Sequence, residues 1–251
     1  MTGIHRTAAA GFVDGELYEQ GRPDYPSGTV EVLEVVAGTP VVDLGCGTGK
    51  FTRLLDSQGA NVIGAEPLPA MLATFRQRCP AIPVVAGTAE ALPFGDRRFE
   101  VVTCASAFHW FDHSRALPEI HRVLRPGGRL GIVWNRRDQI EGWSAEFWAI
   151  TEAYRHATPG YRSGEWRAAL EASGLFGSIT EHWFDYVQHV DIDGLLARMR
   201  SASFIEVLPE DERNDVLERG RRFVQEHPDT AGRDTFELPY RTAVYIVDRL
   251  D

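Results

Sequence analysis

Cysteine is scarce in this sequence, and long apolar runs are absent. Its 251 residues include three cysteines, Cys46, Cys79 and Cys104, which lie far apart in the chain. An odd number of widely spaced cysteines forms neither a disulfide framework nor a zinc cluster. No stretch approaches the roughly 18–20 apolar residues that cross a bilayer, and residues 1–20 contain no apolar block typical of a secretory signal. We therefore expect a protein of the reducing cytoplasm without a membrane span.

Basic residues are outnumbered by acidic ones. The sequence has 26 lysines and arginines against 36 aspartates and glutamates, a formal net charge of −10. Nucleic-acid binding depends mostly on neutralising phosphates, so this balance argues against a nucleic-acid partner. The overall charge does not exclude a local basic groove. The hydrophobic content of 43% is ordinary for a globular protein and excludes a disordered chain.

The first half of the chain alternates between strand-like and helix-like segments. Short apolar runs are followed by segments whose apolar residues recur at helical spacing, with glycine or proline between them. Such a succession is typical of βαβ units in a doubly wound α/β sheet. We expect strands at 41–44, 61–65, 84–86, 99–105 and 129–134, helices at 49–57, 69–77 and 115–124, and a turn at Pro126-Gly127-Gly128.

After Asn135 the alternation ends and the pattern becomes mainly helical. No repeat, low-complexity tract or linker divides the sequence, so we expect one domain with additions after its fifth strand. The elements expected in this part are helices within 143–176 and from residues 192 and 209, and strands at 179–187 and 236–246.

The most informative segment is a glycine-rich loop between the first strand and the first helix. Gly45, Gly47 and Gly49 follow Asp43 at alternate positions. Glycines allow backbone conformations that a side chain forbids, and they let a ligand lie against the main chain. Glu66 ends the second strand 23 residues after Asp43, close to the roughly 20-residue spacing at which a carboxylate reaches both hydroxyls of a ribose. The loop and the acid together predict a nucleotide-type site.

Two other nucleotide-binding patterns fit this loop poorly. A dinucleotide-binding loop needs a third small residue at the position where Lys50 stands. A P-loop ends in Gly-Lys followed by Ser or Thr, whereas here Phe51 follows Lys50. These departures count against NAD and exclude the P-loop pattern.

Five segments, taken in order, resemble the class I S-adenosylmethionine-dependent methyltransferases. They are VVDLGCGTG at 41–49, Glu66, GTAEALPF at 87–94, FEVVTCASAFHWF at 99–111 and RVLRPGGRLGIVW at 122–134. Within that family the chain is similar to the ubiquinone/menaquinone-biosynthesis and trans-aconitate methyltransferase-like group. The resemblance implies a Rossmann-like, doubly wound α/β fold with a mostly parallel seven-stranded sheet, helices on both faces and a helical insertion after strand 5.

The resemblance also implies the cofactor, S-adenosyl-L-methionine, with S-adenosyl-L-homocysteine as product. Residues 1–251 would form a single methyltransferase domain, with a lid segment over 1–30, a cofactor-binding core over 38–137, and helical cover and terminal strands over 138–251. Thr88 stands where many relatives carry an acid that pairs with the adenine amine. The implied cofactor contacts are Tyr18 and Arg22 from the lid, Asp43, Gly45, Gly47 and Gly49 at the methionine, Glu66 at the ribose, Met71, Thr88, Ala89 and Glu90 at the adenine, and also Pro67 and Ala105.

One histidine is placed to act as a base. Methyl transfer is an in-line displacement that depends mainly on positioning, and a base matters only for an acceptor that is protonated at neutral pH. His109 follows the fourth strand, at the sheet edge where ligands bind; a structural hydrogen bond there is the equal alternative. His113 lies four residues on, but no third ligand is evident, so we expect no metal. The candidates for substrate contact are Tyr25, Phe108, Trp110, Trp134 and Arg136.

The sequence leaves the methyl acceptor open. We expect a small-molecule O, N or C acceptor, and a quinone-precursor carbon, a carboxylate and a phenol are all compatible with the resemblance. Residues 105–108 contain neither the Asn/Asp-Pro-Pro-aromatic pattern nor the Pro-Cys nucleophile of nucleic-acid methyltransferases. The alternatives are a nicotinamide-dependent oxidoreductase on a Rossmann-type fold, which Lys50 disfavours, and a non-catalytic S-adenosylmethionine-binding protein. The sequence does not indicate an oligomeric state.

Overall fold

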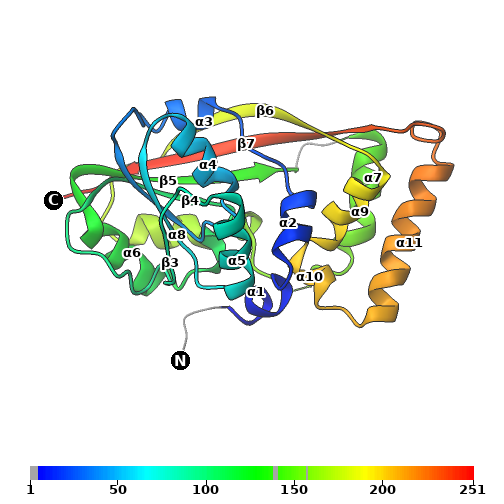
Figure 1. Cartoon of the computed structure of the whole chain (residues 1–251), viewed down its shortest axis with the longest axis horizontal. Coiled ribbons are helices and arrows are strands. Elements are labelled where there is room, and N and C mark those ends of the chain that lie inside the picture. Colours follow the sequence, from blue (N-terminus) through cyan, green and yellow to red (C-terminus); the bar gives the residue numbers. More distant parts are fainter. Residues whose placement is uncertain (1–4, 138–140, 157) are drawn as a thin grey trace.

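In the computed structural model, seven strands form one continuous sheet (Figure 1). The structure describes residues 5–137, 141–156 and 158–251, and within them the strand order is β3-β2-β1-β4-β5-β7-β6. Strands β1 to β5 pair in parallel, and β7 runs antiparallel to both β5 and β6. The predicted α/β fold with a mostly parallel seven-stranded sheet is confirmed. The strands are β1 Pro40–Leu44, β2 Asn61–Ala65, β3 Val84–Val85, β4 Phe99–Ala105, β5 Leu124–Arg136, β6 Thr180–Val190 and β7 Phe236–Asp248.

Helices cover both faces of the parallel part of the sheet. They are α3 Gly28–Glu31, α4 Lys50–Ser57, α5 Pro69–Arg78, α6 His113–Val123 and α8 Glu165–Ala172. Val42 and Val102 pack in a core with α6 and α8, whereas Val41 and Val101 pack in a separate core with α3 and α4. Neighbouring residues of one strand enter different cores because side chains alternate between the two faces of a sheet.

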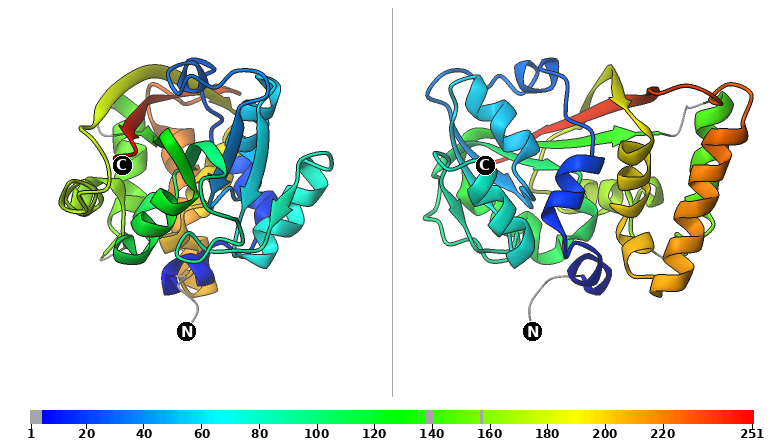
Figure 2. Two further views of the ribbon diagram at one scale, coloured as in Figure 1. Left: turned by 90° about the vertical axis from the view of Figure 1, so that its left-hand side faces the viewer. Right: turned by 45° about the vertical axis from the view of Figure 1, so that its right-hand side comes forward.

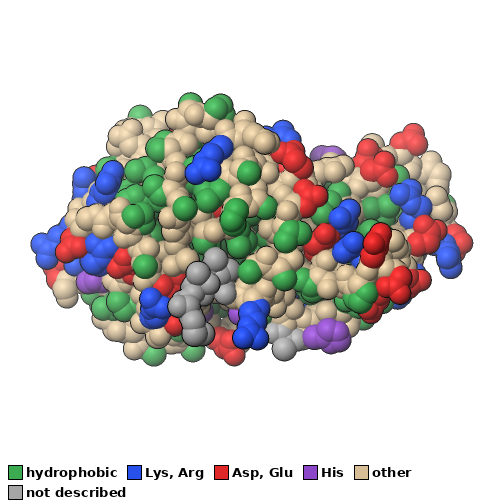
Figure 3. Space-filling model, turned by 60° about the horizontal axis from the view of Figure 1, so that its bottom comes forward, with side chains coloured by type: hydrophobic (Ala, Val, Ile, Leu, Met, Phe, Trp, Pro, Cys, Tyr) green, Lys and Arg blue, Asp and Glu red, His purple; other side chains and the backbone are tan. Residues whose placement is uncertain are grey.

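Four further helices surround the far ends of β6 and β7 and form the predicted helical insertion (Figure 1). They are α7 Gly142–Glu152, α9 Ile192–Arg200, α10 Ser203–Glu206 and α11 Glu210–Glu226. Their own core contains Phe147, Leu195, Val216 and Phe236, from α7, α9, α11 and β7. On the face seen in Figure 3, acidic and basic side chains alternate over the end that holds α11.

The N-terminal segment is helical and lies between the sheet and the insertion (Figure 2). It contains α1 Arg6–Gly11 and α2 Gly15–Gly21. Asp14 begins α2, because its side chain accepts a hydrogen bond of 2.9 Å from the backbone N–H of Leu17. Helix α2 packs closely on α9: a Cβ at Gly21 would lie 2.5 Å from the carbonyl oxygen of Ala197. The segment over 1–30 that was expected to form the lid thus contains α1, α2 and the start of α3, and its first four residues lie outside the described part of the chain.

Some boundaries differ from the sequence predictions. Strand β5 begins at Leu124, so the expected turn at Pro126-Gly127-Gly128 lies inside the strand. Gly127 has a φ of +74°, and the pairing of β4 with β5 shifts register between Phe99 and Val101. The glycines thus form an irregularity of the strand. The expected boundary at residue 138 lies outside the described ranges, and within those ranges no helix has the length and apolarity needed to cross a membrane.

Candidate functional site

The glycine-rich loop turns the chain sharply between β1 and α4. Gly45 and Gly49 have positive φ angles, of +60° and +92°. A Cβ at Gly45 would lie 2.6 Å from the Cβ of Ala107, and a Cβ at Gly49 would lie 2.5 Å from the Sγ of Cys79. Glycine is required at both positions because it avoids the strain and the overlap. Gly49 precedes α4 and lines neither of the two cavities described below. It packs closely against Cys79, and its cofactor contact stays a prediction.

Asp43 is fully buried beneath the loop. Its two carboxylate oxygens accept hydrogen bonds from the hydroxyl of Thr52 on α4, at 2.7 Å, and from that of Thr103 on β4, at 2.8 Å. Burial raises the pKa of Asp43 to about 6, and these two hydrogen bonds oppose the shift. Asp43 lines neither cavity. Asp43 thus holds β1, β4 and α4 together under the loop, and the cofactor contact expected for it stays a prediction.

Glu66 lies at the carboxyl end of β2, as predicted, and faces the larger of the two cavities described below. Its exposed fraction is 4%. One carboxylate oxygen accepts a hydrogen bond from the backbone N–H of Gly47 and the other from that of Leu68, both at 2.9 Å. Burial raises the pKa of Glu66 to about 7, although both hydrogen bonds lower it. The carboxylate is thus fixed in orientation, and a ligand hydroxyl that donates to it would favour its charged form.

The larger cavity lies between the carboxyl ends of β1, β2 and β4 and the N-terminal helices. The space between its walls, part of it open to solvent, is about 740 Å³. Most of the predicted cofactor residues meet there. Trp110, which was expected against the substrate, lines the same cavity. The predicted residues in its wall are Tyr18, Gly45, Gly47, Glu66, Pro67, Met71, Thr88, Ala89, Glu90, Ala105 and Trp110.

A lid over 1–30 was expected, but the wall residues His5, Ala8 and Phe12 within it were not predicted individually. The ring of Phe12 lies 5.9 Å from that of Trp110 and 5.7 Å from that of Tyr18, and the ring of His5 lies 5.3 Å from Trp110. No motif marks this stretch, so the sequence contained no signal for it. That residues at the strand ends would line the cavity was predictable, because ligands bind at the carboxyl ends of parallel strands. The other unpredicted lining residues are Ala8, Leu44, Ala65, Leu68, Gly87, Ser106, Ala107 and Phe111.

A second cavity of about 500 Å³ adjoins the first and has a more polar wall. The two share Tyr18, Gly45, Gly47, Ala105 and Ser106. The hydroxyl of Tyr25 lies 3.1 Å from that of Ser106, and burial raises the pKa of Tyr25 well above its ordinary value. Among the predicted residues, Arg22 and Tyr25 line this cavity, whereas Lys50, Asn135 and Arg198 were not predicted.

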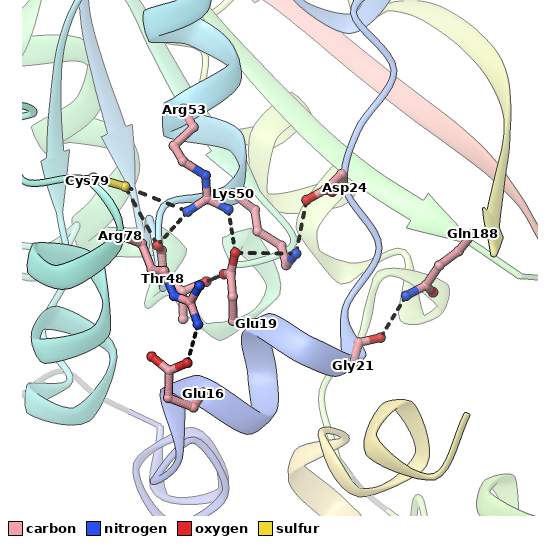
Figure 4. Close-up of polar contacts among 10 residues, drawn as sticks. All are labelled: Glu16, Glu19, Gly21, Asp24, Thr48, Lys50, Arg53, Arg78, Cys79 and Gln188. Atoms are coloured by element: carbon pink, nitrogen blue, oxygen red, sulfur yellow. Dashed lines mark hydrogen bonds and ion pairs between the residues drawn. The ribbon is translucent and has the colours of Figure 1, made fainter. Parts of the chain in front are cut away.

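Helix α2 is fastened to the glycine-rich loop through Glu19 (Figure 4). The Glu19 carboxylate accepts hydrogen bonds from the hydroxyl of Thr48 at 2.6 Å and from the guanidinium of Arg53 at 2.5 Å. The ammonium group of Lys50 lies 3.6 Å from Glu19 and 3.0 Å from Asp24. Lys50, which replaces the third small residue of a dinucleotide-binding loop, thus pairs with the lid segment. The lid closes one side of both cavities, because Tyr18 lines each of them.

His109 lies in the short 3₁₀ helix η1, Phe108–Trp110. Its Nδ1 accepts a hydrogen bond of 3.3 Å from the indole N–H of Trp134, so the neutral ring carries its proton on Nε2. Burial, with the nearby charge of Arg22, lowers the pKa of His109 to about 3. His109 lines neither cavity. The structure therefore favours the structural alternative over the predicted base.

Three of the predicted substrate contacts lie in packing positions. Phe108 is fully buried in the core between β4 and α6, and Trp134 is 2% exposed in the same core. Arg136 donates a hydrogen bond of 2.7 Å to the hydroxyl of Tyr245 and lies over the ring of Trp183. None of the three lines either cavity, and their substrate contacts stay predictions. Among the described residues, no group of three or more His, Cys, Asp and Glu side chains could hold a metal ion.

Comparison with known proteins places these features in a family. Residues 42–132 match the methyltransferase domain family. A methyltransferase of Mycobacterium tuberculosis is 36% identical over 225 residues, 90% of this chain and 89% of the relative. A methyltransferase-like protein of Schizosaccharomyces pombe is 34% identical over 233 residues, 91% of each chain. The demethylmenaquinone methyltransferase of Thermus thermophilus is 41% identical over 100 residues, 37% of this chain and 46% of the relative.

Solved structures share the fold at lower identity. A type II methyltransferase from Anaeromyxobacter dehalogenans superposes with a TM-score of 0.66 at 21% identity, covering 90% of this chain and 96% of the other. An S-adenosylmethionine-dependent methyltransferase from Thermotoga maritima superposes with a TM-score of 0.53 at 20% identity, covering 94% of each chain. The glycine-rich loop, the acid after β2, the strand order and relatives that match nine-tenths of the sequence lead to one conclusion: the chain is an enzyme of the class I S-adenosylmethionine-dependent methyltransferase family.

Proposed function

We propose that this enzyme transfers a methyl group from S-adenosyl-L-methionine to a small-molecule O, N or C acceptor. The observation that carries the proposal is the Glu66 carboxylate, which two backbone N–H groups hold at the edge of the larger cavity. An oriented carboxylate at this place accepts hydrogen bonds from both hydroxyls of a ribose. In this proposal residues 38–137 bind the cofactor within a single domain, and the lid and the helical insertion enclose the acceptor.

The residues around the larger cavity fit an adenosyl group. Met71 and Leu68 give it apolar walls near Glu66, and Thr88 and Ala89 lie beside them. The loop at Gly47 brings main chain to the opening, and a Cβ there would meet nothing within 4 Å. The flat adenine ring would lie between the apolar walls, and the ribose would lie at the polar site beside them.

Positioning supports the chemistry. When bound, the cofactor supplies a sulfonium methyl group: an electron pair of the acceptor bonds to the methyl carbon as the carbon–sulfur bond breaks, and that bond's electrons remain on sulfur. The chain orients the reactants in the two joined cavities, and good alignment can remove about 7–11 kcal/mol of the barrier. Helix α2 shields the reactants from water. His109 is not assigned the role of base in this proposal, because the Nδ1 lone pair of its neutral ring accepts the indole N–H of Trp134.

Calorimetric titration with S-adenosyl-L-homocysteine tests the cofactor assignment. We expect saturable binding that Glu66→Ala weakens about tenfold or more, as expected for losing hydrogen bonds to a charged group. NADH is the matched alternative ligand and should give no saturable heat. Tight binding of NADH, or S-adenosyl-L-homocysteine binding that is equal in the variant, would contradict the proposal. Incubation with labelled cofactor and a metabolite extract then separates a transferase from a non-catalytic binder, because only the transferase yields labelled small molecules.

A further inference from the structure

Three arginines from separate segments meet beside the second cavity. Arg22 follows α2, Arg137 follows β5, and Arg198 lies on α9. Arg22 and Arg198 both line the cavity. The guanidinium groups of Arg137 and Arg198 both lie over the ring of Trp148, at 4.0 and 5.3 Å from its centre. The positive charges of Arg137 and Arg198 thus both lie over the ring of Trp148. Arg22, from the lid segment, lines the same cavity as Arg198.

These charges are poorly neutralised within the described residues. Arg198 is 5% exposed, and its one hydrogen bond runs from Nε to the hydroxyl of Tyr240 at 3.1 Å. Arg22 donates to the carbonyl of Ser201 at 2.5 Å, and neither Arg22 nor Arg198 lies within ion-pair distance of a carboxylate in the part of the chain that the structure describes. Residues 5–137, 141–156 and 158–251 supply no hydrogen-bond partner for the buried Nε of Arg22 or the buried Nη1 of Arg137.

Among the described residues, the acidic group that lies closest to Arg137 is already shared with other arginines. Glu152 lies 3.8 Å from Arg137 but accepts two shorter hydrogen bonds from Arg155 and also faces Arg162. Burial, and then the charge of Arg198, lowers the pKa of Arg22 to about 10 and that of Arg137 to about 9. A buried charge without a counter-ion is costly to the folded state. A bound anion would therefore stabilise this arrangement.

The cofactor alone does not supply enough. Its methionine end carries one carboxylate, which Arg22 at the lid is placed to meet. Arg137 and Arg198 remain, on the side of the cavity formed by the insertion. A ligand there would adjoin the first cavity through Gly45, Gly47 and Ser106, which both cavities share. This is the position from which an acceptor faces a methyl donor.

We propose that Arg198, supported by Arg137, binds an anionic group of the methyl acceptor, so that the substrates of this enzyme are small organic anions carrying a carboxylate or phosphate. The inference rests on the proposed function, since it names the substrate class of the same site. It replaces the sequence-based candidate Arg136, which packs against Tyr245 and Trp183, with residues on α9 and after β5. A guanidinium suits this task because its planar donors pair with carboxylate and phosphate oxygens.

Calorimetry with the full chain separates this inference from the proposed function. S-adenosyl-L-homocysteine is titrated first, into the wild type and into Arg198→Met, Arg198→Lys and Arg200→Met. Arg200 is the matched control, because it lies on the same helix but pairs with Glu206 and lines neither cavity. Benzoate, malonate, inorganic phosphate and neutral benzamide are then titrated into each protein saturated with S-adenosyl-L-homocysteine, at constant ionic strength.

We expect at least one anion to bind the wild type more tightly than benzamide does, and Arg198→Met to weaken that binding about tenfold or more. Arg198→Lys should weaken it less, because the charge stays but the planar donors are lost. Arg200→Met should bind like the wild type, and all four proteins should bind S-adenosyl-L-homocysteine alike. Failure of the wild type to bind S-adenosyl-L-homocysteine refutes the proposed function itself. Anion binding no tighter than that of benzamide, or lost S-adenosyl-L-homocysteine affinity in Arg198→Met, overturns only the acceptor inference.

Discussion

The carboxylate of Glu19 on α2 accepts a hydrogen bond of 2.5 Å from the guanidinium of Arg53 on α4 (Figure 4). Both side chains are largely shielded from water, with exposed fractions of 13% for Glu19 and 33% for Arg53. The pair joins the lid to the helix that follows the glycine-rich loop. The docking of α2 beside the glycine-rich loop therefore includes a polar contact between two residues that line neither cavity.

Glu19→Gln is expected to weaken binding of S-adenosyl-L-homocysteine without changing any residue of the cavity walls. The variant keeps the size of the side chain but loses the ion pairs with Arg53 and Lys50, so the docked lid becomes less populated. We expect a rise of about three- to tenfold in the dissociation constant, mainly through faster release. Stopped-flow release of the ligand measures this directly.

Glu16→Gln is the control for that variant. Glu16 lies on the same helix and pairs with Arg78, but its exposed fraction is 53%. Exposed pairs contribute little, so its ligand release should match the wild type. Equal release rates for Glu19→Gln and the wild type would show that the lid is held by other contacts.

Binding of S-adenosyl-L-homocysteine should strengthen as pH rises through neutrality. The pKa of Glu66 in the free protein is raised to about 7, so the carboxyl group is partly protonated at neutral pH. Ribose hydroxyls that donate to it favour the charged form, so binding releases a proton. The affinity should increase roughly tenfold between about pH 6 and pH 8. Calorimetry in buffers of different ionisation enthalpy counts the released proton, and Glu66→Gln should remove both effects.

Glu66 should also make the free protein less stable at higher pH. Its folded pKa, about 7, lies above its ordinary value of 4.5, so the folded state holds the proton more tightly than the unfolded state does. The stabilisation is present below the ordinary value and is lost as pH rises through about 7. Asp43, raised from 3.8 to about 6, acts in the same direction. Urea unfolding of the free protein should show stability falling across this range, and stability rising there would contradict the assignment.

Two alanine substitutions in the glycine-rich loop should affect different properties, one the stability of the fold and the other the affinity for the ligand. Gly49→Ala places a Cβ 2.5 Å from the Sγ of Cys79 and 3.0 Å from the ring of Phe75, so it should destabilise the fold by about 2–4 kcal/mol. Gly47→Ala meets nothing within 4 Å, so only its positive φ costs stability, about 1 kcal/mol. Gly47 lines both cavities, and its variant should lose ligand affinity instead. Thermal unfolding and calorimetry distinguish the two, and similar effects on both properties would refute this division.

His109 should remain uncharged throughout the range in which enzymes are usually assayed. Burial lowers its pKa to about 3, and Trp134 occupies its Nδ1. Long-range ¹H–¹⁵N spectra should show one neutral ring with its proton on Nε2 at all pH values above about 4. An inflection near the ordinary histidine value of about 6.5 would restore His109 as a candidate base.

Local patterns predicted the parallel sheet and its ligand-binding edge. The strand at 41–44, the glycines after it and Glu66 lie close in sequence, and the carboxyl ends of parallel strands necessarily meet. Asp43 shows the limit of this reasoning. A buried acid and a ligand-binding acid look alike in sequence, and only the hydroxyls of Thr52 and Thr103 decide which one it is.

Contacts between distant segments were beyond the sequence. Arg22 and Ser201 are joined by a hydrogen bond although they are 179 positions apart, and no periodicity predicts which helix of an insertion returns to the lid. The same holds for Arg198, whose place beside the second cavity follows from the packing of α9 on α2. His109 was identified by its position after β4, but its partner Trp134 belongs to another strand.

The close fit of Gly21 against the carbonyl of Ala197 has an evolutionary consequence. The helix that closes over the donor rests directly on the helix that contributes Arg198. A lineage that adopted a differently shaped acceptor by shifting α9 would also displace α2. Sequence changes that move one of these helices are therefore constrained by the other. New preferences should then arise through side-chain replacement on a fixed backbone, with Gly21 retained.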